Sequence, residues 1–271
     1  MCSVLKVSRA GYYKFIHARK SRRAIENEVL NEEITEIYFQ YKKRYGYRRI
    51  KAELESRGRK VNHKRIVLRM RELGFAAEYP RKKHGVYRKS AGDLASENIL
   101  GQYFRAEDKN KIWVGDITYI KTREGFLYLM VYLDVYTRKV IGWAMDKQMR
   151  EQLALTAIQA AVWAESPMPG LVVHTDRGSQ FMGKKYKDLL SKHGLIASMS
   201  RPGNPYDNAV AEAFHKTLKT ELMRGMGMFA NREIAKKAVF EYIEIFYNRQ
   251  RRHSALGYKS PRQFEMHYCS I

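Results

Sequence analysis

Residues 111–145 read KIWVGDITYIKTREGFLYLMVYLDVYTRKVIGWAM, and this stretch predicts three successive β-strands. Aromatic and β-branched side chains dominate it and partly alternate with polar ones, which is typical of strands. Two short breaks, at Glu124 with Gly125 and at Thr137 with Arg138, divide the stretch into three. Because breaks this short join neighbouring antiparallel strands, we expect a three-stranded meander.

The chain that follows alternates between helical and strand patterns. An amphipathic helix at 150–164 ends before a Pro- and Gly-containing break, and a short apolar strand, LVVHTD, follows at 171–176. We then expect a helix near 182–193, the strand LIASMS, the loop RPGNPYDN, and helices at about 208–223 and 231–248. The order β-β-β-α-β-α-β-α predicts an α/β fold with a mixed five-stranded sheet and flanking helices.

The segment upstream of this sheet has helical spacing instead. Apolar residues recur every three or four positions in 29–44, and a second short helix is expected at 47–56. After a Gly-containing turn, Asn62 is a plausible N-cap for a third helix that Gly74 closes. Two short helices joined in this way fit a small all-α helix-turn-helix domain. A small helical bundle with a solvated basic face stays open as the alternative.

These patterns divide the chain into five parts. We expect an N-terminal helical segment, a helix-turn-helix-like DNA-binding domain, a basic linker, a catalytic core, and a C-terminal helix with a basic extension. The predicted boundaries are 1–28, 29–78, 79–105, 106–225 and 226–271.

The charge balance restricts the class of partner. The chain has 51 Lys and Arg against 28 Asp and Glu, a formal net charge of +23. Such a surplus repels itself in the folded state, so an acidic partner is expected, and nucleic acid fits best; a generic solvated basic protein is the other interpretation. No run of about 18 apolar residues exists, and the first residues do not resemble a secretory signal. Cys2 and Cys269, at opposite ends, offer no disulfide framework and favour a reducing compartment.

Three acids stand out against this basic background. Asp116 lies in the first strand, Asp176 at the end of the fourth, and Glu212 early in the helix after the RPGNPYDN loop. Mg²⁺ prefers hard oxygen ligands, and a divalent cation explains negative charge where a polyanion must approach. Asp134 is a competing carboxylate that could instead pair with a neighbouring arginine. His174 could support the site or be a satisfied core histidine.

The helix that carries Glu212 supports a role for this acid. At about 100° per residue, Val210, Phe214, Thr217 and Leu218 fall on one apolar face, roughly opposite Glu212. His215, Lys216 and Lys219 are expected on the same side as Glu212. This helix would therefore pack one face on the core and present the other to metal and DNA.

The sequence motifs around these acids resemble those of a known family. They read WVGDITYI around Asp116, HTDRGSQF around Asp176 and SRPGNPYDNAVAEAFHKTLKTEL around Glu212, with YNRQRRHSALGYKSP downstream. The 35 residues between Asp176 and Glu212 match the D-D(35)E spacing of the retroviral integrase superfamily. Nearly the whole chain resembles bacterial insertion-sequence transposases, specifically the second-frame (OrfB-type) product of the insertion sequence "three" family.

This resemblance implies a fold and a chemistry. It implies a ribonuclease-H-like core in which Asp116, Asp176 and Glu212 are catalytic and bind two Mg²⁺ or Mn²⁺ ions. Water would attack a phosphodiester at the element end and free a 3′-hydroxyl. That hydroxyl would then attack a second phosphodiester and join the strands, with no covalent protein–DNA intermediate.

The resemblance also implies partners. They are double-stranded DNA at the element ends and target, further copies of the chain on DNA, and an upstream-frame product, in the bacterial cytoplasm at the nucleoid and not at a membrane. The two distant cysteines cannot form the His/Cys zinc domain of retroviral integrases. Lys219 matches the family's basic position seven residues after the glutamate. The candidate DNA contacts are Arg48, Arg49, Lys64, Arg65, Arg69, His215, Lys216, Lys219, Arg249, Arg252 and His253.

Besides a metal-dependent DNA strand transferase, the sequence is compatible with two other classes of protein. A non-catalytic DNA-binding accessory or regulator needs only the helix-turn-helix and the charge. A recombinase with a Tyr or Ser nucleophile would form a covalent adduct with DNA. The three acids in family-like contexts favour the strand transferase over both.

Overall fold

The computed structural model describes residues 2–77, 96–101, 103–201, 205–223 and 227–268. The chain forms two compact units, one ending at Ala77 and one following it. Most of the predicted linker, 79–105, and part of the RPGNPYDN loop lie outside the described residues. Within the described ranges, no helix is long and apolar enough to cross a membrane.

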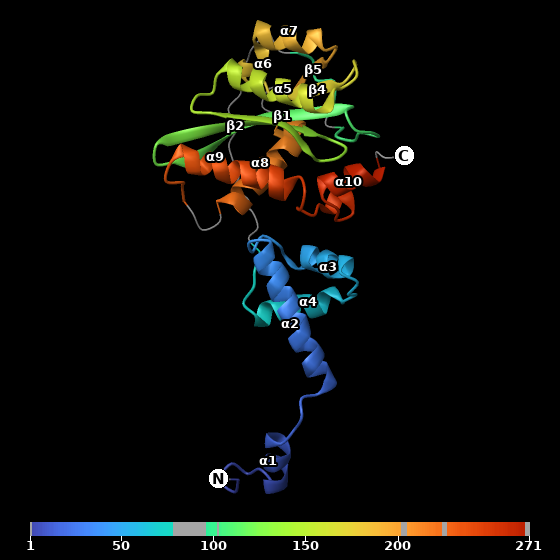
Figure 1. Ribbon diagram of the computed structural model, residues 1–271, viewed down its shortest axis with the longest axis vertical. Coiled ribbons are helices and arrows are strands. Elements are labelled where there is room, and N and C mark those ends of the chain that lie inside the picture. The colour runs from blue at the N-terminus through green and yellow to red at the C-terminus, as the bar shows by residue number, and fades with distance from the viewer. Residues whose placement is uncertain (1, 78–95, 102, 202–204, 224–226, 269–271) are drawn as a thin grey trace. The chain divides into compact units, whose positions relative to one another are not determined.

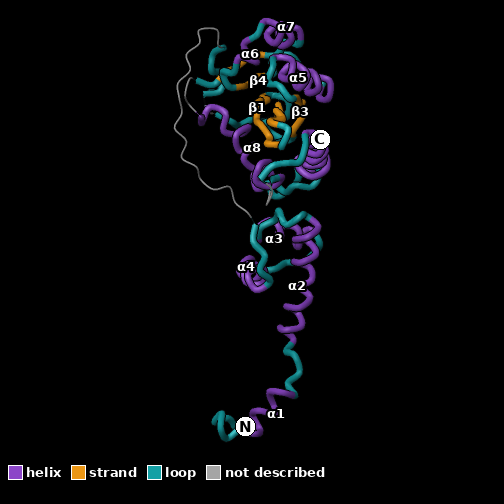
Figure 2. The backbone as a smooth tube through the Cα atoms, turned by 90° about the vertical axis from the view of Figure 1, so that its left-hand side faces the viewer, coloured by secondary structure: helices purple, strands orange, loops and turns teal. Residues whose placement is uncertain are grey.

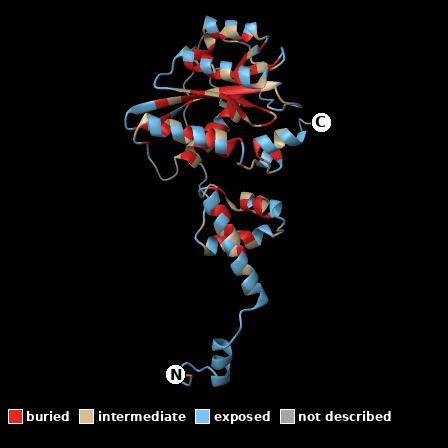
Figure 3. Cartoon of the chain, in the orientation of Figure 1, coloured by how far each residue is buried: buried red, intermediate tan, exposed pale blue. Residues whose placement is uncertain are grey.

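The N-terminal unit is all-helical (Figure 1). Helix α1 (Arg9–Ile16) has no buried residue and is exposed throughout (Figure 3). Helices α2 (Arg22–Gln40), α3 (Tyr47–Ser56) and α4 (His63–Glu72) share a small apolar core. Asn62 caps α4 as predicted, since its side chain accepts a hydrogen bond from the Lys64 amide at 2.8 Å. The fully buried members of this core are Leu30, Ile34, Ile37, Tyr45, Ile50 and Ile66.

Helix α2 begins seven residues earlier than the sequence pattern predicted. Residues 22–28 are mostly polar and contribute no buried side chain to the core, so the start at 29 was wrong. The physical cause is Ser21, whose hydroxyl accepts a hydrogen bond from the Ala24 amide at 3.2 Å and caps the helix. The helix ends at Gln40, before Lys42 and Lys43 adopt positive φ values of 50° and 62°.

The second unit contains the predicted five-stranded mixed sheet. The strands are β1 (Ile112–Thr122), β2 (Gly125–Asp134), β3 (Val140–Asp146), β4 (Val172–Thr175) and β5 (Ile196–Met199). Their order is β3-β2-β1-β4-β5, with antiparallel pairing from β1 to β3 and parallel pairing of β1 with β4 and β4 with β5. The meander and the parallel units are both confirmed, as is the ribonuclease-H-like α/β class.

Helices cover both faces of this sheet (Figures 1 and 2). Helices α5 (Glu151–Glu165), α6 (Ser179–Met182) and α7 (Lys184–Lys192) lie on one face. Helices α8 (Ala209–Leu222), which follows the 3₁₀ turn η1 (Pro205–Asn208), and α9 (Arg232–Phe240) lie on the other. The chain continues through the π-helical η2 (Glu241–Tyr247), the 3₁₀ turn η3 (Ser254–Leu256) and α10 (Pro261–Tyr268).

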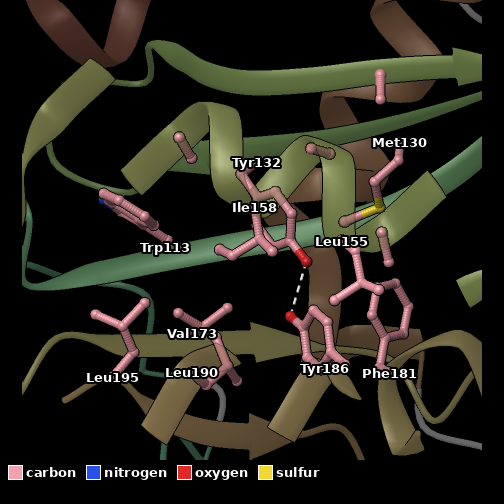
Figure 4. Packing of buried hydrophobic residues seen from close by; sticks show 14 of the residues in the cluster. Trp113, Met130, Tyr132, Leu155, Ile158, Val173, Phe181, Tyr186, Leu190 and Leu195 are labelled. Carbon is pink, nitrogen blue, oxygen red and sulfur yellow. Dashed lines mark hydrogen bonds between the residues drawn. The ribbon is translucent and has the colours of Figure 1, made fainter. Parts of the chain in front are cut away.

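The main core lies between the sheet and α5 to α7. Trp113 and Val173 from the sheet pack there with Ile158 of α5 and Phe181 of α6 (Figure 4). The hydroxyls of Tyr132 and Tyr186 share a hydrogen bond of 2.7 Å inside this core. Trp113 therefore marks the face of β1 that packs on α5 to α7, and the even-numbered side chains of β1 point to the side of α8.

Three details of the helices differ from the sequence prediction. The helix expected near 182–193 is confirmed as α7, but the short helix α6, which precedes it and ends before Gly183, was not predicted. The helix expected at 231–248 ends as the π-helical η2. Helix α10 was not predicted as a separate helix, although Pro261 at its first position is a common start signal.

Gly142 in β3 brings the sheet close to α5 and gives a test of this packing. A Cβ at this position would lie 2.5 Å from the Ala157 carbonyl oxygen and 2.6 Å from the Ala161 amide nitrogen. Because both are main-chain atoms of a helix, they cannot move aside easily. We expect Gly142→Ala to lower the free energy of unfolding by about 1–3 kcal/mol in urea denaturation. Gly227→Ala, whose Cβ would meet nothing within 4 Å, is the matched control and should be nearly neutral.

Candidate catalytic site

Asp116 and Asp176 are brought together by the register of two neighbouring strands. Strands β1 and β4 run parallel, with Val114 opposite His174. If that register continued for two more residues, Asp176 would lie opposite Asp116, with the two backbone segments about 4.8 Å apart. Side chains of a strand alternate between its two faces. The Asp116 side chain therefore points to the face away from Trp113, toward α8. Asp176 directly follows β4, and its Oδ1 accepts a hydrogen bond from the Gly178 amide at 3.0 Å.

Helix α8 carries Glu212 in its first turn and packs against β1. Asn208, just before α8, donates from its side chain to the Gly115 carbonyl oxygen at 3.1 Å, next to Asp116. The preceding Asp207 is fully buried and accepts hydrogen bonds from Asn98 and from the amide and guanidinium of Arg201. These contacts hold the start of α8, and therefore Glu212, beside the middle of β1.

Two of the acids act electrostatically on the third. Burial, together with the negative charges of Asp176 and Glu212, raises the pKa of Asp116 to about 8, against the Ile117 amide and Lys219. Desolvation also raises the pKa values of Asp176 and Glu212, although both residues reach the surface. The acids therefore form one repulsive group that is open to solvent on one side.

The chemistry of this group suits a divalent cation. Carboxylate oxygens are hard ligands, and a cation would relieve the repulsion that disfavours their ionised forms. In the part of the chain that the structure describes, no three His, Cys, Asp or Glu side chains are close enough to form a metal site alone. The three carboxylates are therefore not gathered into a ready ligand set in this structure, and a cation held there would need water and substrate phosphate as further ligands.

His215 lies inside the fold, which corrects its prediction as a DNA contact. The residue is 6% exposed, and its Nε2 atom is 3.6 Å from Oδ2 of Asp116. Burial lowers the pKa of His215 to about 3, assisted by the charge of Lys219 and opposed by the main chain of Asp116. Its side chain is therefore neutral and turned toward β1, away from the solvent-facing side of α8.

Lys219 and Lys216 lie on the accessible side of α8. The Nζ atom of Lys219 is 4.3 Å from the ring centroid of Tyr119, a cation–π contact. Burial lowers the pKa of Lys219, while Asp116 raises it. Lys216 is exposed one turn after Glu212 and lowers the pKa of that acid. Both ammonium groups therefore border the acidic group.

Asp134 and His174, the other two candidates, have structural roles. Asp134 is buried and accepts hydrogen bonds from the amides of Asn110 and Thr137 and from the Thr137 hydroxyl. It therefore holds the turn after β2. The ring nitrogens of His174 lie 2.9 and 3.2 Å from the hydroxyls of Ser198 and Ser200, so it is a satisfied core histidine.

The remaining predicted DNA contacts fall into two groups. Arg48, Lys64 and Arg249 are exposed, whereas the others contact neighbouring groups of their own unit. Arg49 stacks over Tyr45, Arg65 donates to Asn27, Arg69 to Glu72, and Arg252 to the Tyr258 carbonyl oxygen, while His253 packs against Tyr247.

Sequence reasoning missed a buried ion pair at the other end of α8. Arg251 donates to both carboxylate oxygens of Glu221 at 2.8 to 3.1 Å, and the Tyr242 hydroxyl donates to the same carboxylate at 2.8 Å. The side chains of Arg251 and Glu221 are 7% and 9% exposed. In the sequence, Arg251 is one of four polar residues in RQRR, and nothing there distinguishes the buried one.

Comparison with protein families agrees with this architecture. Two models described as "Integrase core domain" match residues 106–205 and 193–261. A model described as "HTH-like domain" matches residues 24–83. The matches cover the acidic group and α2 to α4, respectively.

Individual proteins also match over most of the chain. The transposase for insertion sequence element IS904 of Lactococcus lactis is 43% identical over 250 residues, covering 92% of this chain and 98% of that protein. The transposase InsF for insertion sequence IS3A of Escherichia coli is 42% identical, covering 98% of this chain and 92% of that protein. The HTLV-2 integrase catalytic core domain, solved in complex with magnesium, is 18% identical, with a TM-score of 0.45, and covers 59% of this chain and 99% of that one.

Proposed function

Because this chain belongs to the transposases of insertion sequences such as IS3 and IS904, we propose that Asp116, Asp176 and Glu212 carry the DNA cleavage and joining of transposition. DNA transposition is the function of the family, and the helix-turn-helix-like and integrase core domains bind DNA. The proposal concerns the residues, the metal and the mechanism by which this chain performs it.

The observation that carries the proposal is the electrostatic effect of two of the acids on the third, Asp116. Asp176 and Glu212, distant in sequence, both raise the pKa of Asp116. The β1–β4 register and the Asn208 contact with Gly115 supply the geometric basis for that effect. A fold that uses two strands and a helix to gather like charges stabilises them only with a compensating cation or substrate.

We assign the divalent cations, two Mg²⁺ or Mn²⁺ ions, to these three carboxylates. When bound, they supply Lewis acidity to the scissile phosphate and to the attacking hydroxyl. Asp116 provides a fixed ligand because it lies within a central strand. Asp176 and Glu212 reach the surface, so a DNA strand can approach them without opening the fold.

The basic side chains next to the acids position the DNA. Lys219 and Lys216 border the acidic group and can contact nonbridging phosphate oxygens on either side of the scissile bond. In the first step water attacks the phosphorus and forms a new phosphorus–oxygen bond, the bond to the 3′ oxygen breaks, and that oxygen leaves as a 3′-hydroxyl while the phosphate stays on the neighbouring 5′ end. In the second step this hydroxyl attacks a target phosphodiester, and the target's own 3′ oxygen leaves.

We also propose the partners. The chain acts on element ends and target DNA at the nucleoid, as an oligomer that brings two ends together, and it cooperates with an upstream-frame product. The alternative, a non-catalytic accessory, requires the acids to be dispensable. No described contact favours that alternative over catalysis.

The test is a cleavage and joining assay on labelled element ends. We expect 3′-hydroxyl ends and joined products with Mg²⁺ or Mn²⁺, and none after chelation, with or without the upstream-frame product. An enzyme that cleaves equally well in chelator, or that forms a covalent protein–DNA adduct, would contradict the mechanism. Absence of cleavage under all conditions would favour the accessory role.

Binding to DNA should depend steeply on salt. Each neutralised phosphate contributes a log–log slope of roughly −0.9. We expect Lys216→Gln to reduce the magnitude of the slope by about one phosphate contact, as measured by fluorescence anisotropy with duplex DNA. Lys192→Gln, which removes an exposed lysine of α7 on the opposite face of the sheet, should leave the slope unchanged. Equal slopes for the Lys216 variant and wild type would remove Lys216 from the interface.

A further inference from the structure

His215 is a buried polar side chain without a hydrogen-bond partner. Among the described residues, neither its Nδ1 nor its Nε2 atom has a partner within hydrogen-bond distance. A buried polar group left unsatisfied costs about 1–3 kcal/mol, so native proteins retain one where it has a use. An apolar residue would fill the same place between α8 and β1 without this cost.

The carboxylate of Asp116 lies beside the ring, as does the Asp116 main chain, which opposes the lowering of the His215 pKa. Nε2 lies 3.6 Å from Oδ2, just beyond a hydrogen bond. The other oxygen, Oδ1, already accepts a hydrogen bond from the Ile117 amide at 2.9 Å. Oδ2 is therefore the oxygen that a donor on α8, such as His215, can orient. Hydrogen bonds in active sites are often long in the free protein and shorten when the site is loaded.

The position of His215 on α8 connects this contact to Glu212. The two residues are three positions apart, which is about one helical turn, so both are carried by the same rigid segment. Glu212 faces solvent and His215 faces Asp116. A single helix thus supplies one acid of the group and a donor aimed at another acid.

We propose that His215 is a positioning residue whose Nε2–H donates to Oδ2 of Asp116 and orients this carboxylate toward the divalent cation. The inference rests on the proposed function, because it assumes that Asp116 holds the cation. Groups that hydrogen-bond a metal-ligating side chain fix its rotamer and typically change metal affinity 10- to 100-fold when removed. His215 acts from within the fold and touches neither DNA nor the cation.

Metal affinity tests this role without requiring catalysis. Mn²⁺ is titrated calorimetrically into the full chain without DNA, comparing wild type, His215→Leu and His215→Gln. We expect His215→Leu, which fills the space without a donor, to weaken Mn²⁺ binding about 10- to 100-fold. His215→Gln has an amide nitrogen at the position of Nε2 and should bind within about threefold of wild type. Thermal unfolding without metal shows whether each variant is folded, and His215→Met replaces His215→Leu if the latter is not.

The outcomes separate this inference from the proposed function. Asp116→Asn is measured in parallel and should lose Mn²⁺ binding. If Asp116→Asn loses binding while the folded apolar variant at position 215 binds like wild type, the positioning role is wrong and the catalytic assignment stands. If Asp116→Asn binds like wild type, or wild type itself binds no Mn²⁺, the metal assignment fails and the role of His215 with it. A glutamine variant as weak as the leucine variant would also contradict the donor role.

Discussion

Asp116→Asn, Asp176→Asn and Glu212→Gln should each reduce cleavage of element ends by about a thousandfold or more, with DNA binding retained. The substitutions keep size and one oxygen but remove the negative charge that a divalent cation requires. Loss of an interaction made at the reacting phosphate is expected to cost at least as much as loss of one preorganised hydrogen-bond donor, about 10²- to 10³-fold. DNA affinity should be unchanged or higher, because each change removes a negative charge from a basic surface. Gel-based cleavage with Mg²⁺ and anisotropy binding measure the two effects separately.

The matched control is Asp146→Asn. Asp146 ends β3, is exposed, and accepts a hydrogen bond from the Gln148 amide that an asparagine oxygen can also accept. It makes the same chemical change at another strand end of the same sheet. Cleavage by this variant should equal that of wild type. If any of the three amide variants cleaved as fast as Asp146→Asn, that residue would not belong to the catalytic group.

Arg251→Ala should lower the free energy of unfolding by about 3–5 kcal/mol. Removing one partner of a buried ion pair leaves the other as an uncompensated buried charge. Here the group left without its counter-ion is Glu221, at the end of α8, whose carboxylate also accepts a hydrogen bond from the Tyr242 hydroxyl. Urea denaturation of the full chain measures the loss. A loss this large would leave a domain of ordinary stability nearly unfolded.

Arg252→Ala is the neighbouring control for this prediction. Arg252 is half-buried and donates to the Tyr258 carbonyl oxygen. Its removal loses this hydrogen bond to a neutral acceptor, so we expect a loss of roughly 1 kcal/mol. The double variant Glu221→Gln with Arg251→Gln should recover part of the loss, because it removes both charges. Equal destabilisation by the two arginine variants would show that the ion pair is not the cause.

The sequence allowed much of the sheet to be predicted because its signals are local. Alternation and short breaks define three strands between 111 and 145, and helix-length segments between later strands require parallel crossovers. The approach of Asp176 to Asp116 depends on the register of β1 and β4, in which Val114 lies opposite His174, and no local pattern contains that register. The family-like motifs around the acids indicate these residues without that register.

Side-chain environments on helices were harder to predict. The pattern placed Val210 and Thr217 on the apolar face of α8, yet the buried residues include Ala211 and His215. Small side chains such as Ala211 let a helix approach a sheet closely, and this turns α8 by about one residue from the orientation that maximises its apolar face. His215 is buried as a result. Arg251 was missed for a related reason, since burial of an arginine depends on a distant acid.

The Glu221–Arg251 pair bears on how this protein can be divided into fragments. Its two residues lie on opposite sides of residue 225, where the integrase-like core was expected to end. A gene trimmed to stop near that boundary would encode α8 with a carboxylate that has lost its counter-ion and with an uncovered apolar side. A fragment that contains only the integrase-like unit should therefore end beyond η3, so that it includes Arg251.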